Sequence, residues 1–207
     1  MACAGLLAGA CSSEESGSEP YPSLITELMN IPTDKSGYGR TIETDKGRIY
    51  ALSQPLKDLQ PDTVYRIAGG YVLTDRLDGG YTVAELRAAS PVMLLRPEKT
   101  TADDTGDDPI KVTSIWRGGA YLNFHLTPKT QGGQHEWGYR PGDITETATG
   151  HTYSLTLRHR QPGDPHSYST TVYASLSLNE LGQLQPGDSI AVDILTFDGW
   201  KTWRLPF

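Results

Sequence analysis

The five histidines are the residues whose type and spacing could do chemistry, because imidazole binds metals and exchanges protons near neutral pH. All of them fall between His125 and His166. His151 and His159 share one expected strand face but stand roughly 26 Å apart at about 3.3 Å per residue, too far for one ion. His125 could still meet His159 across neighbouring strands, and His166 with Asp164 could join another loop. We predict no metal and no cofactor.

Familiar catalytic signatures are missing from the sequence. It contains no Gly-x-Ser-x-Gly elbow, no His-Glu-x-x-His pair and no phosphate-binding glycine loop. Both cysteines, Cys3 and Cys11, precede the expected mature domains, which leaves these domains without a thiol nucleophile or a disulfide. Asp193 and Asp198 could form the acid pair of a glycoside hydrolase, although Asp198-Gly199 is more simply a hairpin turn. We predict a non-enzymatic protein, with a glycan-acting surface hydrolase as the alternative.

Charge and hydropathy restrict the partners. The formal net charge is −7, and no basic stripe is present that could neutralise phosphates, so we predict no nucleic-acid partner. No run of 18 apolar residues occurs, and we therefore expect no membrane-spanning helix.

Cys11 stands at a sharp change in composition. The small apolar run Ala4–Ala10 precedes it, and the polar, acidic stretch Ser12–Pro20 follows. This junction resembles a bacterial lipobox, in which a signal peptide is cut before a cysteine that carries the lipid. We interpret residues 1–10 as the remnant of a longer signal peptide and residues 11–22 as a lipid anchor with a flexible acidic tether. The acidic tract resembles the export signal of Bacteroidetes lipoproteins.

That interpretation predicts where in the cell the protein is located. We expect a lipid-anchored outer-membrane protein that faces the cell surface, with the periplasmic face as the alternative. Its partners would be the membrane, through the lipid on Cys11, and an unknown protein or glycan.

Strand signals recur through the rest of the chain, as short apolar and β-branched runs between Gly, Pro and Asp residues. In the first half the expected strands are Leu24–Asn30, Gly39–Thr44, Arg48–Leu52, Thr63–Leu73 and Pro91–Leu95. In the second half they are Ile110–Trp116, Ala120–Leu126, Thr152–Arg158, Ser169–Leu178, Ser189–Leu195 and Trp200–Leu205. Short helices are expected at Val83–Ala89 and Leu178–Leu184. Tight turns are expected at Gly47, at Pro141-Gly142 and at Pro186-Gly187.

The two groups of strands predict two all-β domains, at residues 23–96 and 110–207. The stretch between them, residues 97–109, is acidic, bounded by prolines and empty of large apolar residues, so we interpret it as a linker. Many short strands joined by turns favour barrels and sandwiches. Because the linker is polar, we expect some movement between the domains.

Several strings in these domains resemble the NigD-like family of Bacteroidetes lipoproteins. For the family's N-terminal OB-like barrel the strings are Arg48–Leu52, Asp62–Ile67 and Pro91–Leu95. For its C-terminal β-sandwich they are Tyr121–Leu126, resembling an opening strand, and Ser154–His159, Gly163-Asp164 and Ala174–Leu178, resembling a central hairpin. The resemblance implies an OB-like barrel followed by a β-sandwich. The family name derives from a bacteriocin locus and implies no established activity, so a bacteriocin-associated accessory role is a further alternative.

Aromatic and basic side chains supply the candidate binding surface. Trp116 and several tyrosines belong to the same aromatic-rich second domain. The chosen candidates are Arg48, Tyr50, Tyr65 and Arg66 on the barrel, and Trp137, Tyr139, Trp200 and Trp203 on the sandwich. Such side chains suit sugar rings or peptides, and an OB barrel binds ligands on the face that would carry the first four. The alternative is that the barrel is structural and most aromatics fill the core.

Overall fold

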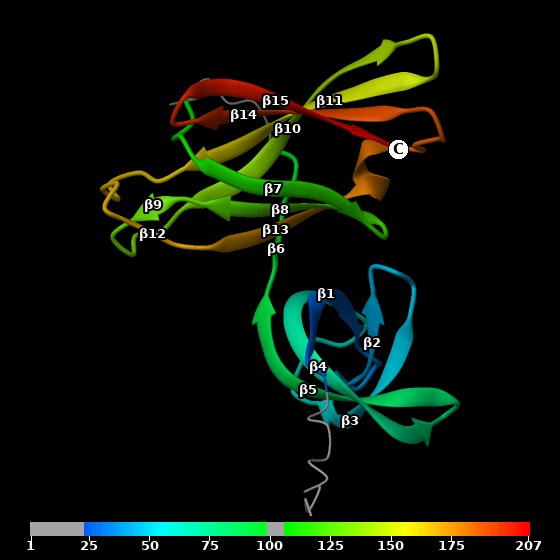
Figure 1. Ribbon diagram of the computed structural model, residues 1–207. Coiled ribbons are helices and arrows are strands. Elements are labelled where there is room, and N and C mark those ends of the chain that lie inside the picture. The colour runs from blue at the N-terminus through cyan, green and yellow to red at the C-terminus, as the bar shows by residue number, and fades with distance from the viewer. Residues whose placement is uncertain (1–22, 99–105) are drawn as a thin grey trace, which may run out of the picture.

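Two β-domains lie one above the other in Figure 1, a barrel below and a sandwich above. The computed structural model describes residues 23–98 and 106–207, so the predicted signal remnant, Cys11 and the tether lie outside the described residues. Within the described ranges no helix is long and apolar enough to cross a membrane. The predicted all-β fold with a C-terminal sandwich is confirmed. Every expected strand overlaps an observed one.

The first domain is a closed barrel with the strand order β1-β2-β3-β5-β4. Its strands are β1 (Ile25–Pro32), β2 (Gly39–Thr44), β3 (Ile49–Leu56), β4 (Val64–Asp78) and β5 (Tyr81–Pro91). Met29, Ile31, Ile42 and Tyr71 fill its interior and are almost fully buried. The barrel agrees with the OB-like interpretation, which stays a prediction.

The helix predicted at Val83–Ala89 is wrong, because this segment belongs to strand β5. Its Ala, Glu, Leu and Arg residues favour helix locally. However, the turn at Gly79 and Gly80, both with positive φ, folds β5 back onto β4, and Val83 and Ala84 enter the core. Pairing and burial therefore override the local preference.

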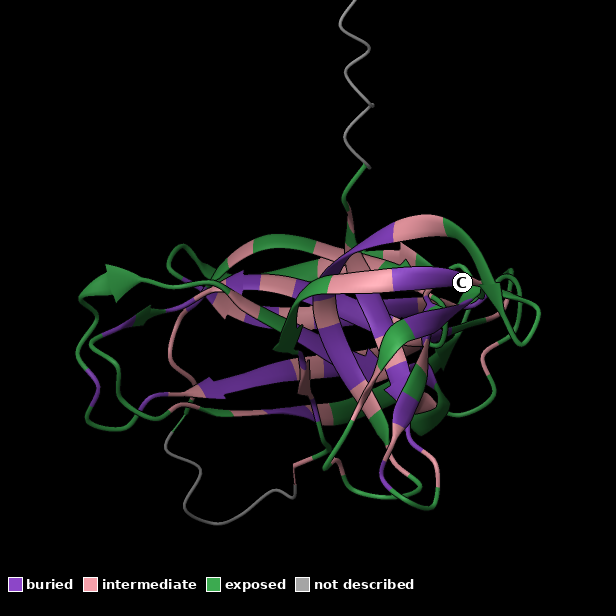
Figure 2. Ribbon diagram, turned by 90° about the horizontal axis from the view of Figure 1, so that it is seen from below, coloured by how far each residue is buried: buried purple, intermediate pink, exposed green. Residues whose placement is uncertain are grey.

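The second domain is a sandwich of two four-stranded sheets, β10-β11-β14-β15 and β6-β13-β8-β7. The strands of the first sheet are β10 (Glu136–Glu146), β11 (His151–Arg160), β14 (Ser189–Thr196) and β15 (Gly199–Pro206). Those of the second are β6 (Met93–Leu94), β7 (Lys111–Gly118), β8 (Tyr121–Thr127) and β13 (Val172–Ser177). Short strands β9 (Lys129–Thr130) and β12 (Tyr168–Ser169) pair beside them. Figure 2 shows buried residues concentrated in the strands and exposed ones at the projecting hairpins.

Three local predictions in the sandwich are corrected. Pro141-Gly142 is not the expected tight turn but lies inside β10, where the pairing register shifts between Pro141 and Ile144. Strands β11 and β13 do not form a hairpin, because they belong to different sheets. The helix expected at Leu178–Leu184 is a single 3-10 turn, Leu178–Leu181, which ends at Gly182 with φ of 108°. The turns at Gly47 and Gly187, both with positive φ, are confirmed.

The described ends of the predicted linker are bonded to the sandwich. The backbone amide of Glu98 donates to the Tyr139 carbonyl at 2.8 Å, and the amide of Asp108 donates to the His159 carbonyl at 2.8 Å. Just before them, Met93 of β6 pairs with Ala174. The two segments that flank the acidic stretch are therefore both bonded to the sandwich.

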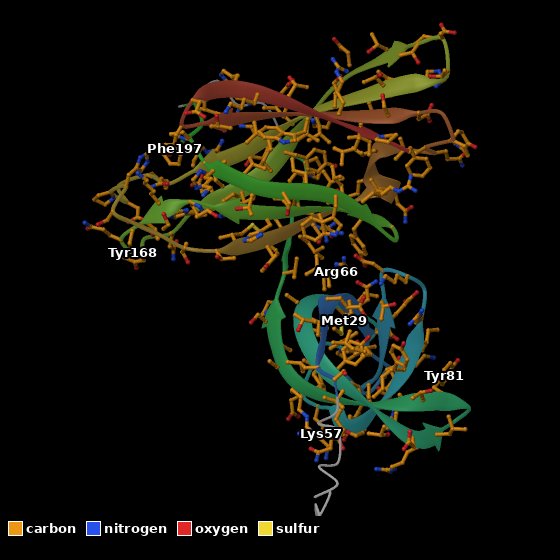
Figure 3. The ribbon with its side chains drawn as sticks, viewed as in Figure 1. Met29, Lys57, Arg66, Tyr81, Tyr168 and Phe197 are labelled. Atoms are coloured by element: carbon orange, nitrogen blue, oxygen red, sulfur yellow. The ribbon has the colours of Figure 1, made fainter. Side chains whose placement is uncertain are left out.

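Arg66 joins the two domains. Its side chain is fully buried and forms a two-pronged ion pair with Asp45, at 2.6 Å and 2.7 Å. It also donates to Asn30 of the barrel at 3.2 Å. From the sandwich, Asn123 accepts a hydrogen bond from Arg66 at 3.1 Å and Ser175 accepts one at 3.4 Å. Figure 3 shows Arg66 at the barrel end that faces the sandwich.

The same interface is completed by close packing. The ring of Tyr121 lies under the Arg66 guanidinium, with 4.2 Å between the ring centroid and Arg66 Cζ. The Asn123 amide donates to Asp45 at 3.2 Å. Gly118 has to be glycine here, since a Cβ at this position would lie 2.3 Å from the Asp45 carboxylate. The domains are thus held by charge-assisted hydrogen bonds, which are directional and about twice as strong as neutral ones.

Asp45→Asn should destabilise the protein by about 3 kcal/mol, because it leaves the Arg66 charge buried without its counter-ion. Urea unfolding followed by tryptophan fluorescence measures the loss. Glu85→Gln is the matched control, since Glu85 forms an exposed pair with Arg87 and such pairs contribute little. Equal losses in the two variants would contradict the assignment.

Candidate functional site

Burial separates the four barrel candidates. Tyr50 and Arg66 are buried, which takes them out of an exposed binding surface. Tyr65 is half-buried against the barrel core, and its hydroxyl accepts from the backbone amide of Gln60 at 2.9 Å. Arg48 is exposed. The four side chains therefore do not form one continuous face.

The sandwich candidates are also dispersed. Tyr139 is 1 % exposed and donates to Glu180 at 3.1 Å, and burial raises its pKa to about 12. Trp203 packs against the core, whereas Trp200 is 57 % exposed on the same strand, as their odd spacing predicts. Trp137 is half-buried beside the histidines described below. Only Trp200 stands freely on the surface.

A cleft of about 980 Å³ runs between the barrel and the sandwich. The barrel contributes β1 from Ile25 to Leu28, together with the β2–β3 turn at Asp45 and Lys46. The sandwich contributes the β7–β8 hairpin, Pro186 and Phe207. Asp45 borders the cleft and accepts a hydrogen bond from Asn123 of the sandwich at 3.2 Å, so a contact between the domains lies at the edge of the cleft.

Aromatic and basic side chains of the sandwich line this cleft. Trp116 is half-buried, and Arg117 extends over the ring of Phe207, 4.6 Å from its centroid. Lys46 is exposed on the opposite wall. Sequence reasoning noted Trp116 only as one aromatic among many and missed the other three. No local sequence pattern links these four residues, because they come from segments that are 70 or more residues apart.

A chain of polar groups connects the cleft to the predicted barrel residues. Glu27 lines the cleft and accepts from the Tyr71 hydroxyl at 2.6 Å. Burial, with the Glu27 carboxylate as a second cause, raises the pKa of Tyr71. The Tyr50 and Tyr71 rings lie 5.6 Å apart, and the Tyr50 hydroxyl raises the pKa of Arg48. Arg48 and Tyr50 thus support the cleft wall rather than form a surface of their own.

A second polar cluster lies at one end of the sandwich, where Figure 3 places Tyr168. Asp164 accepts from Thr130 and bonds His135 Nε2 at 2.9 Å. Nδ1 of His135 lies 2.9 Å from Nε2 of His159, and Nδ1 of His159 lies 3.1 Å from the Asp108 carbonyl. Asp164 therefore joins another loop, as expected, through Thr130 and His135, whereas none of these hydrogen bonds involves His166.

The bonding in this cluster determines its protonation. The Asp108 carbonyl only accepts, so His159 donates from Nδ1, and burial lowers the pKa of His159 to about 4 and keeps its Nε2 unprotonated. His135 must then donate to that nitrogen. Its Nε2 faces the Asp164 carboxylate, whose pKa the Thr130 hydroxyl, with His135 as a further partner, holds well below its ordinary value. His135 thus joins Asp164 to His159 of β11.

This arrangement explains where the histidines go. His125 does not meet His159 but stacks on Tyr173, 4.8 Å between centroids. His166 lies 4.0 Å from Asp108 and edge-on to Phe197. Across the residues described, no three His, Cys, Asp or Glu side chains are placed to hold a metal ion.

The acids suggested for glycoside hydrolysis are each engaged by a neighbouring side chain. Asp193 accepts from Thr202. Asp198 lies in the β14–β15 turn and pairs with Lys201 at 2.7 Å. Their contacts are those of adjacent strands and a hairpin turn.

Comparison with known proteins identifies the family. Residues 91–207 match the model of the NigD-like C-terminal beta sandwich domain, so this chain belongs to the NigD-like family. The matched region begins at Pro91, directly before β6. No curated protein sequence matches the chain.

Solved structures share the whole two-domain arrangement. A NigD-like immunity protein from Bacteroides caccae is 26 % identical with a TM-score of 0.65, covering 89 % of this chain and 93 % of its own. A protein from Parabacteroides distasonis described as toxin-related is 16 % identical with a TM-score of 0.70, at 89 % and 93 % coverage. A protein from Bacteroides fragilis described as a lipoprotein is 11 % identical with a TM-score of 0.64, at 90 % and 98 % coverage. The last two likenesses show the fold alone.

The low pKa of His159 predicts how stability depends on pH. A folded pKa of about 4, against an ordinary value of 6.5, means that the unfolded chain binds the proton first as pH falls. The contribution of the neutral His159 side chain to the free energy of unfolding is complete above pH 6.5 and is lost progressively as the pH falls to about 4. From pH 7 to pH 5 the wild type should lose about 2 kcal/mol more than His159→Gln in urea unfolding.

His125→Gln is the control for this prediction, since it removes a histidine of the opposite sheet. It should keep the wild-type dependence on pH. Parallel pH profiles for the wild type and His159→Gln would show that the buried imidazole is not responsible.

Proposed function

We propose that this NigD-like protein is a non-enzymatic, lipid-anchored protein of the outer membrane that faces the cell surface and binds a partner protein in an immunity-like accessory role. Family membership and the immunity protein from Bacteroides caccae support the accessory role. The likeness to a protein described as a lipoprotein agrees with the anchor expected at Cys11.

The cleft between the domains is the observation that carries this proposal. Its volume of about 980 Å³ lies at the upper end of small-molecule pockets, and it is open along two domains, which suits a protein segment. Trp and Arg are the side chains most enriched among residues that dominate protein interfaces, and Trp116 and Arg117 supply both.

The fixed geometry of the cleft adds to this argument. Because Arg66 and Asp45 of the barrel bond Asn123 and Ser175 of the sandwich before any partner arrives, binding need not order the two domains. Preorganisation of this kind lowers the entropic cost of association. A linker that left the domains free would forfeit that advantage.

A photo-crosslinking amino acid at position 116 should trap one discrete partner protein in intact cells. The same amino acid at position 200 is the matched control, because Trp200 is the exposed tryptophan of the opposite sheet. Trp116→Ala should weaken binding of the trapped partner by about 30-fold, the effect of losing a dominant interface residue. The same adducts from both positions, or none from 116, would contradict a binding site in the cleft.

Cys11→Ser, tested in a gene with its native upstream sequence, should move the protein from the membrane to the soluble fraction. Metabolic labelling with palmitate should disappear at the same time, because the thiol is the attachment point of the lipid. A variant that keeps both its membrane fraction and its label would show that Cys11 is not the anchor. Cys3→Ser is the control and should leave both unchanged.

A further inference from the structure

The β4–β5 hairpin extends well beyond the barrel. Strand β1 begins opposite Tyr71, whereas β4 continues to Asp78 before the turn. Beyond the last contact with β3, at Val83 and Ala84, the two strands of the hairpin pair only with each other. Such a two-stranded ribbon gains no support from a core.

Apolar side chains stand on this unsupported ribbon. Leu77 is 72 % exposed, the highest value among the large apolar residues described, and Tyr81 is 43 % exposed. They belong to opposite faces, because Leu77 pairs with Thr82 and Tyr81 with Asp78. A hairpin that lies flat on a partner would cover one of them, whereas a hairpin that enters end-on covers both.

The hairpin projects sideways from the part of the barrel that lies farther from the sandwich (Figure 1). Arg66 lies at the barrel end that contacts the sandwich, whereas Tyr81 and Lys57 lie toward the other end (Figure 3). The first strand begins on the hairpin side of β4, because Ile25 pairs with Tyr71 whereas Pro32 pairs with Val64. Leu24, just before it, is a third exposed apolar residue at 61 %. The chain thus arrives on the side from which the hairpin projects.

We propose that the β4–β5 hairpin contacts the lipid surface of the membrane to which the chain is anchored, with Leu77 and Tyr81 in the interface. This inference rests on the proposed lipid anchor at Cys11. The 12 residues from Cys11 to Pro22 span at most about 40 Å, so the barrel cannot leave the vicinity of the bilayer. Tyrosine is enriched at membrane–water interfaces, where its ring meets lipid and its hydroxyl meets water.

The charges of the hairpin fit this role. Asp75, Arg76 and Asp78 give the tip no excess of positive charge, so it does not recruit the protein electrostatically. The lipid on Cys11 brings the protein to the membrane. Once the chain is tethered, the effective concentration of the hairpin at the surface is high, and a contact too weak to bind the free protein orients the tethered one. The sandwich is then presented away from the membrane.

An environment-sensitive fluorophore on the hairpin tests this contact. The full chain carries Cys3→Ser and Cys11→Ser, an N-terminal histidine tag, and one label at Arg76→Cys. It is tethered to phosphatidylcholine vesicles that contain a nickel-chelating lipid. Emission should shift to shorter wavelength on tethering, and Leu77→Ser with Tyr81→Ser should abolish the shift.

The β10–β11 hairpin supplies the matched control. It also projects and carries an exposed apolar residue, Ile144 at 59 %. A label at Glu146→Cys should report water with or without vesicles, and Ile144→Ser should leave the signal at position 76 unchanged. Unaltered urea midpoints verify that the variants fold.

Two results would overturn the proposal. If the label at position 76 still reports water when the protein is tethered, the hairpin does not contact lipid, and a protein partner becomes the better explanation of its exposed apolar residues. Equal emission shifts at positions 76 and 146 would show that the contact is not specific to the β4–β5 hairpin. Because the nickel lipid provides the tether, these outcomes are independent of lipidation at Cys11. A lipid anchor without hairpin contact, and a hairpin contact without the native anchor, are thus distinguishable.

Discussion

The buried guanidinium of Arg66 is the group on which the two-domain structure depends. It pairs with Asp45 inside the barrel and donates to Asn123 and Ser175 of the sandwich, so the domains cannot move apart without breaking hydrogen bonds to a buried charge. A buried pair of this kind contributes less to net stability than to specificity of arrangement, because desolvation offsets much of its attraction. Here the specified arrangement is the placement of the barrel against the sandwich.

The other features follow from that placement. The cleft exists because the β2–β3 turn and the β7–β8 hairpin meet at Asp45 and Gly118, with Trp116 and Arg117 carried alongside. At the far end of the sandwich, a second charged centre, His135 with Asp164, holds loops to β11. Each centre consists of directional hydrogen bonds around a buried charged side chain, Arg66 in one and Asp164 in the other. These two centres hold the domains and the loops of the sandwich in place, and the described residues contain no disulfide.

The sequence predicted the class of fold and most strands, because alternation, turn residues and burial agree along the chain. It failed at β5, where good helix formers are paired into a strand, and at β10, where Pro141-Gly142 imitates a turn inside a bulged strand. The candidate site was harder still. Arg66 was assigned to a binding face of the barrel but is buried, since nothing local shows that Asp45, Asn123 and Ser175 converge on it. Long-range convergence of this kind has no periodicity to read.

The fixed arrangement of the domains is the central claim, and a distance measurement tests it most directly. Spin labels at Lys57→Cys on the barrel and Arg204→Cys on the sandwich, with Cys3 and Cys11 replaced by serine, report the separation by double electron–electron resonance. One narrow distance distribution is expected, broadened when Arg66→Met removes the buried cation. A broad distribution in the unaltered interface, or a narrow one that survives Arg66→Met, would contradict the account.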